Sequence, residues 1–122
     1  MARILLVEDN DMNRDMLSRR LQRKGHEVLM AADGMQAILM AESELPDLIL
    51  LDMSLPVIDG WEAARRLKAD PKTRSIPLIM LTAHAFDEHR QRAADVGADA
   101  FLPKPVLPDA LALEIRKVLA AS

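Results

Sequence analysis

Short apolar runs alternate with helical patterns five times along this chain, and this alternation restricts the fold more than any other feature. We predict strands at residues 3–7, 28–31, 48–52, 76–81 and 100–103. We predict helices at residues 11–24, 34–43, 60–69, 87–96 and 108–120. A strand–helix unit that is repeated in this way predicts a parallel sheet with helices on both faces and right-handed crossovers.

The predicted fold class is α/β: a flavodoxin-like (βα)5 three-layer sandwich with a five-stranded parallel sheet of order 2-1-3-4-5. In that order the strands at 3–7 and 48–52 are neighbours, and the topological switch point of the sheet lies beside them. The chain has 122 residues, half of them hydrophobic, which is enough for one domain with a substantial core. We therefore expect one domain over residues 1–122, without an attached output domain.

The apolar run from Leu48 to Leu51 ends in a carboxylate, that of Asp52. A short, wholly apolar run is typical of a strand that is buried on both faces of a parallel sheet. Pro56 follows soon after and marks a loop, so Asp52 should lie at the carboxyl end of a central strand. A carboxylate next to a buried run is costly unless a cation accompanies it.

Polar side chains also follow the other strands. Glu8 and Asp9 follow the first strand, Thr82 the fourth and Lys104 the fifth. Because the carboxyl ends of parallel strands share one edge of the sheet, these groups should converge on Asp52. Neighbouring carboxylates repel one another unless a cation intervenes. Oxygen ligands without cysteine or clustered histidine favour Mg²⁺ as that cation.

Asp52 would lie in the middle of this group. An aspartate carboxylate is able to attack a phosphoryl group and become an aspartyl phosphate. Such a transfer needs positive charge around the equatorial phosphoryl oxygens, which Mg²⁺, Lys104 and the Thr82 hydroxyl would supply. The strand ends therefore predict phosphoryl chemistry at Asp52.

The composition argues against several other functions. The chain has no cysteine, which excludes disulfides, zinc–thiolate sites and thiol catalysis. One tryptophan, two phenylalanines and a net charge of −3 disfavour nucleic-acid binding by stacking or by a broad basic surface. No apolar run approaches the roughly 18 residues of a membrane span. We therefore expect a cytoplasmic protein that binds neither nucleic acid nor membrane.

Two helices carry specific packing expectations. The first should bury Leu17 and Leu21, with Met12 and Met16 beside them, and the Asn-Asp pair before it offers two candidate N-caps. Trp61 should be a partly buried packing residue at the start of the third helix.

Taken in order and at these spacings, the strand ends resemble the receiver domain of response regulators in two-component signalling. The matching stretches lie at residues 4–10, 47–56, 59–60, 81–83 and 104–105. Each stretch alone is weakly specific, but together they extend over the whole chain. The resemblance is to the single-domain type, which is chemotaxis-regulator-like or DivK-like.

The resemblance implies that Asp52 accepts a phosphoryl group from a histidine of a partner kinase or phosphotransfer protein. It implies Mg²⁺, with Mn²⁺ able to substitute, bound by Asp9, Asp52 and the backbone carbonyl of Ser54, and by Glu8 through water. It also suggests that the peptide bond before Pro105 is cis, since cis bonds occur before proline.

The resemblance further implies a conformational switch. Thr82 would move toward the phosphate, and Phe101, the switch aromatic of the family, would turn inward with it. The signal would leave toward a downstream protein through the face of the fourth helix, fifth strand and fifth helix. The chain would be a monomer or a phosphorylation-dependent dimer. Ser54 and His84 flank the path of the attacking water in this family, so they would tune the lifetime of the phosphorylated state.

Three alternative functions fit the sequence less well. A phosphatase with an aspartyl nucleophile, similar to the haloacid dehalogenases, needs a second Asp two residues later, where this chain has Ser54. A nucleotide or flavin site needs a glycine-rich loop after the first strand, where Glu8, Asp9 and Asn10 stand instead. A pseudo-receiver is disfavoured because all the strand-end residues are intact. We therefore expect a signalling module that turns over only its own acyl phosphate, and not a metabolic enzyme.

Overall fold

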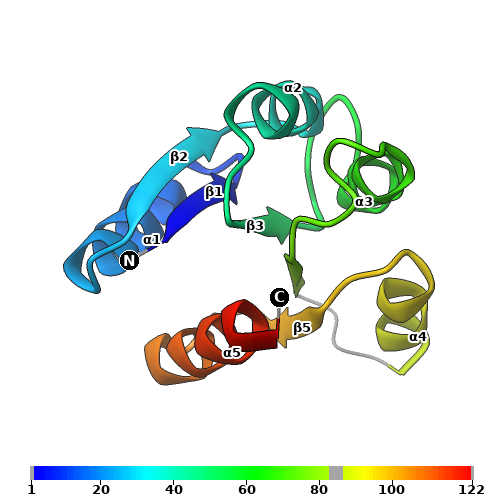
Figure 1. Cartoon of the computed structure of the whole chain (residues 1–122). Helices are drawn as coiled ribbons and strands as arrows, with labels where there is room; N and C mark the ends of the chain where they lie inside the picture. Colours follow the sequence, from blue (N-terminus) through cyan, green and yellow to red (C-terminus); the bar gives the residue numbers. More distant parts are fainter. Residues whose placement is uncertain (1, 83–86, 122) are drawn as a thin grey trace.

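The computed structural model describes residues 2–82 and 87–121, with the backbone alone for residues 87–90 (Figure 1). Strands and helices alternate along the chain in the order β1 (Arg3–Val7), α1 (Asp11–Arg23), β2 (Glu27–Ala31), α2 (Gly34–Glu44), β3 (Leu48–Asp52), α3 (Gly60–Ala69), β4 (Leu78–Thr82), α4 (Asp87–Asp95), β5 (Ala100–Pro103) and α5 (Pro108–Ala121). The strands form one parallel sheet of order β2-β1-β3-β4-β5. The predicted α/β fold and its strand order are confirmed.

Each face of the sheet has its own apolar core, because successive residues of a strand point to opposite faces. One core joins the sheet to α2, α3 and α4, and the other joins it to α1 and α5 (Figure 1). β3 and β4 are buried along their whole length. The layers on both sides therefore hold the carboxyl end of β3 at a fixed place.

Side-chain caps begin the first three helices. The carboxamide or carboxylate oxygens of Asn10, Asp33 and Asp59 each accept a hydrogen bond from the backbone N–H three residues later. Asn10, and not Asp11, is thus the cap of α1. These caps lie in the loops that follow the carboxyl ends of β1, β2 and β3, so they help to fix the backbone at that edge of the sheet.

Most predicted boundaries agree with the structure to within one residue, and the larger differences concern the start of β4 and the side chains of α1. The strand predicted at 76–81 begins only at Leu78, because Pro77 has no N–H to donate to a strand ladder. Met12 and Met16 are 82% and 44% exposed, so neither joins the buried leucines of α1 in the core. Met16 precedes the buried Leu17 by one residue, which is about 100° of helix rotation.

Trp61 is partly buried at the start of α3, as predicted, and packs against the core on that face of the sheet. The guanidinium of Arg92, from α4, lies over its ring at 4.4 Å from the centroid. The two helices are thus joined by a cation–π contact. Within the part of the chain that the structure describes, no helix combines the length and apolar character of a membrane span.

Candidate functional site

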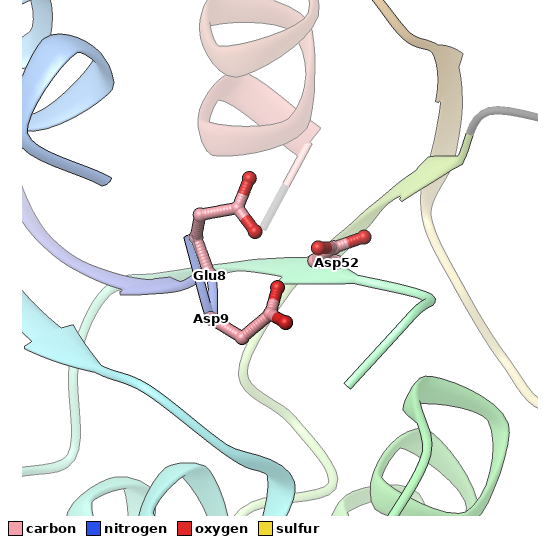
Figure 2. Close-up of side chains that lie close together, drawn as sticks. All are labelled: Glu8, Asp9 and Asp52. Atoms are coloured by element: carbon pink, nitrogen blue, oxygen red, sulfur yellow. The ribbon is translucent and has the colours of Figure 1, made fainter. Parts of the chain in front are cut away.

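Three carboxylates meet at the carboxyl edge of the sheet. The register pairs Val7 of β1 with Leu51 of β3, so Glu8 and Asp9 emerge beside Asp52. One oxygen from each of Glu8, Asp9 and Asp52 lies within 4.8 Å of the others, and Figure 2 shows the three carboxylates close together. The predicted convergence of the acids is confirmed.

Lys104 reaches the same place from the end of β5. Its Nζ lies 2.9 Å from Asp52 Oδ1 and 3.4 Å from Glu8 Oε1. Its backbone N–H donates to the carbonyl of Thr82 at 2.6 Å, which fixes the segment beside β4. The bond between Lys104 and Pro105 is cis, as expected. Lys104, which follows β5, therefore contacts the acids at the carboxyl ends of both β1 and β3.

Asp52 is only 2% exposed, and two donors hold its carboxylate. Oδ1 forms an ion pair with the ammonium of Lys104 and accepts a hydrogen bond of 3.1 Å from the backbone N–H of Ser54. The contribution of the Ser54 amide is a feature that sequence reasoning missed, because it depends on the fold of the loop after β3. The expected role of the Ser54 carbonyl as a metal ligand stays a prediction.

The electrostatics of the site follow from burial and crowding. Burial is the largest cause that raises the pKa of the Glu8 carboxyl to about 7, and the hydrogen bond and charge of Asp52 add to it. The charge of Lys104 acts in the opposite direction. For Lys104 itself, burial lowers the pKa most, but the hydrogen bonds and charges of Asp52 and Glu8 together leave it raised.

The donor set fits a hard divalent cation. Three carboxylates face one ammonium group, so ionisation of all three leaves net negative charge in a largely buried place. Glu8 and Asp52 are buried, whereas Asp9 is exposed, so a cation would have access from solvent. Oxygen donors of this kind are those that Mg²⁺ binds, with water and phosphate completing its shell.

The remaining predicted residues lie around this centre. Thr82 is buried at the end of β4, one residue beyond Leu81, which is the register partner of Asp52. Phe101 is partly buried on β5 and packs against the core that includes α3 and part of α4. His84 lies outside the described residues. The switch roles of Thr82 and Phe101 and the water-tuning roles of Ser54 and His84 stay predictions.

The loop between β3 and α3 packs closely against two glycines, which leave no space for a side chain. A Cβ on Gly60 would lie 2.6 Å from the Cα of Met53 and 2.7 Å from the carbonyl oxygen of Asp52. A Cβ on Gly34, at the start of α2, would lie 2.3 Å from the carbonyl oxygen of Ile58. The sequence marked Gly60 as a helix start, but nothing in the sequence indicated these close contacts with the backbone beside Asp52.

Comparison with known families shows which family of proteins has this arrangement of strand-end residues. The model of the response regulator receiver domain matches residues 4–116, a range that includes all five strand-end residues of the site. This chain belongs to the response regulator receiver domain family. The resemblance noted in the sequence is thereby confirmed.

The receiver domain has relatives of very different lengths. It is 43% identical over 105 residues to the response regulator PleD of Caulobacter vibrioides, which covers 86% of this chain and 23% of PleD. It is 36% identical over 120 residues to the protein PilH of Pseudomonas aeruginosa, which covers 98% of this chain and 99% of PilH. The chain thus spans under a quarter of PleD but nearly all of PilH.

A solved structure supports the same assignment of the fold. The receiver domain of a sensor histidine kinase from Pseudomonas aeruginosa superposes with a TM-score of 0.90 and 36% identity, covering 98% of each chain. That structure has a magnesium ion coordinated in its active-site cleft. The donor chemistry of Glu8, Asp9 and Asp52 in the present receiver domain is compatible with the same ion.

Proposed function

We propose that this receiver domain accepts a phosphoryl group on Asp52 from the phosphohistidine of a kinase or phosphotransfer protein. The observation that carries the proposal is the placement of Asp52 at the end of a wholly buried strand, in contact with Lys104 and beside Glu8 and Asp9. A carboxylate that is held in this way is preorganised for in-line attack on phosphorus.

The transfer needs little from the protein beyond positioning and charge. A carboxylate oxygen of Asp52 attacks phosphorus, the bond from phosphorus to the imidazole nitrogen breaks, and the imidazole leaves with that electron pair. The ammonium of Lys104, 2.9 Å from Oδ1, is placed to neutralise charge on the transferred group. Mg²⁺, or Mn²⁺ in its place, would be held by Asp9, Asp52 and the Ser54 carbonyl, with Glu8 nearby, and would supply further positive charge.

The response that we propose is a conformational switch. Thr82 and Lys104 are joined through their backbones, and β5, which carries Phe101, precedes Lys104. A shift of Thr82 toward the phosphate would therefore displace β5 and change its contacts with α4 and α5. We propose that a downstream protein recognises this face, that the domain acts in the cytoplasm, and that it turns over only its own acyl phosphate.

Acetyl phosphate, a small acyl-phosphate donor, tests the central step. Incubation with acetyl phosphate and Mg²⁺ should add one phosphate to the intact mass of the protein, and chelation of the metal should prevent the addition. Asp52→Asn should stay unmodified, whereas Asp109→Asn, which changes an exposed carboxylate at the start of α5, should behave as the wild type. An unmodified wild type, or an adduct that survives in Asp52→Asn, would disprove the assignment.

A further inference from the structure

The helices α1 and α5 cover the same face of the sheet (Figure 1). A groove lies between them and is lined by residues of both helices. Its volume is about 250 Å³. The buried side chains of Leu21, Leu111 and Ile115 form an apolar floor, and Ala112 lies partly exposed beside them. The strand-end acids and Lys104 do not line this groove, and Arg20 stands between it and the neighbouring pocket that Glu8 and Lys104 line.

Cations surround the apolar floor. Arg20 and Lys24 stand on the α1 side and Arg116 on the α5 side, and no acid is among the described residues that line the groove. None of these three makes an ion pair with a described residue, whereas Arg19 on α1 pairs with Asp15 and Lys117 on α5 pairs with Glu114. The groove is therefore a local positive surface on a chain whose net charge is −3.

His26 also lines the groove, but it does not add a charge near neutral pH. Its Nδ1 accepts a hydrogen bond from the backbone N–H of Ala2 at 3.2 Å. Burial lowers its pKa below the ordinary value, so the imidazole is neutral at pH 7. The positive charge of the groove thus comes from its three long side chains, which are free to reach toward an occupant.

The size and shape of the groove restrict what fits there. Small-molecule sites usually enclose about 300–1,000 Å³, so a groove of about 250 Å³ is better matched to one large apolar side chain. A phosphodiester backbone has no apolar group that would fill a concave apolar floor. A flat bilayer surface cannot enter the groove. We propose that the α1–α5 groove binds an acidic segment of a partner protein, which inserts one large apolar side chain between carboxylates that meet Arg20, Lys24 and Arg116.

A peptide titration of the unphosphorylated chain tests this proposal, so its failure would leave the proposed function at Asp52 untouched. The probe is a synthetic 12-residue peptide with a central leucine and glutamates on both sides, added to the 15N-labelled protein. Amide shifts should concentrate on the groove residues of α1 and α5. Replacing the leucine by alanine should weaken binding by about tenfold or more. Replacing the glutamates by glutamine, or adding salt, should also weaken it.

Matched protein variants assign the two parts of the interaction. Arg20→Glu should abolish the shifts, whereas Arg23→Glu should not, because Arg23 is an exposed cation of the same helix that does not line the groove. Ala112→Leu should block the leucine of the peptide while leaving the cations unchanged. The amide spectrum of each variant without peptide shows whether it is folded, and neither Arg20 nor Ala112 is a fully buried core residue.

Four outcomes would overturn the proposal. The first is the absence of groove shifts at millimolar peptide, and the second is equal binding of the alanine peptide. The third is self-association of the chain that Arg20→Glu removes, since a second copy would then be the occupant. The fourth is binding to phosphatidylglycerol vesicles that depends on Arg20 but is unaffected by Ala112→Leu, which would indicate an anionic surface as the ligand.

Discussion

Glu8 is only 2% exposed although it lies next to a second buried carboxylate, that of Asp52. Burial and the neighbouring carboxylate both disfavour the ionised form of Glu8. The contact with Lys104 favours the ionised form, but the pKa of Glu8 stays raised, so it offsets only part of this penalty. Asp9 differs from both because it is exposed. It is therefore the acid of the cluster that can be neutralised without leaving a buried group unpaired.

We predict that Asp9→Asn raises the melting temperature of the metal-free protein and weakens Mg²⁺ binding. Without metal, the change removes repulsion within the acidic cluster. With metal, it removes a proposed ligand, and the loss should be at least the roughly 10–100-fold that outer-shell changes cause. Thermal unfolding in chelator and a Mg²⁺ titration measure the two effects. Asp95→Asn, a change of equal charge on α4, should leave Mg²⁺ binding unchanged, and a less stable Asp9→Asn protein would contradict the prediction.

At the scale of elements, the loop between β3 and α3 combines tight packing with an unfavourable backbone dihedral angle at one residue. Gly34 and Gly60 leave no space for a Cβ beside Ile58 and the backbone after Asp52. Between these contacts Val57 has a φ of 69° and is 80% exposed. A β-branched residue in the left-handed region is a true outlier, and its exposed side chain makes little compensating contact.

We predict that Val57→Gly raises the free energy of unfolding by about 1 kcal/mol, because glycine adopts a positive φ without the steric cost. The greater freedom of glycine in the unfolded chain offsets part of the gain. Urea unfolding measures the change. Val57→Ala keeps a Cβ and should gain less than Val57→Gly. If glycine instead lowers stability, the Val57 side chain makes contacts that outweigh its backbone strain.

At the scale of the whole molecule, the order of the layers was predictable because each strand is a compact apolar run. The run from Leu48 to Asp52 indicated both its double burial and the position of its carboxylate. Glu8, Asp9 and Lys104 were predictable as site residues for the same reason, since parallel strands bring their carboxyl ends to one edge. The chemistry of the site thus followed from where the strands end.

Other features depend on neighbours that no local pattern specifies. The positive φ of Val57 arises at a non-glycine residue, so composition gave no signal for it. The exposure of Met16 depends on which side of α1 faces the sheet, because Met16 directly precedes the buried Leu17. The groove between α1 and α5 needs side chains from two helices that are far apart in sequence, so no local pattern indicated it.

His26 gives the stability of the whole chain a pH dependence with a definite sign. Its pKa is lower in the fold than in the unfolded chain, so the unfolded chain takes up the proton first. The contribution of His26 is therefore complete above the unfolded pKa of about 6.5 and is lost as the pH falls through that value toward the folded pKa. The neutral ring is also the form whose Nδ1 accepts the hydrogen bond from Ala2.

We predict that the free energy of unfolding of the wild type falls more between pH 7 and pH 5 than that of His26→Gln, which cannot titrate. Urea unfolding without metal at several pH values measures both proteins. The raised pKa of Glu8 acts in the opposite direction in both of them, because a group that is easier to protonate in the fold gains stability as the pH falls. The difference between the two curves therefore isolates His26, and parallel curves would contradict the assignment.

The contact between Trp61 and Arg92 has a practical consequence for studies of signalling. The chain contains one tryptophan and no tyrosine, so almost all of its near-ultraviolet absorption and emission comes from a single indole ring. That ring belongs to α3, and the cation stacked on it belongs to α4, the helix that follows the segment after Thr82. The unlabelled protein thus carries an optical reporter of the spacing between these two helices, and its fluorescence can follow the receiver domain in real time.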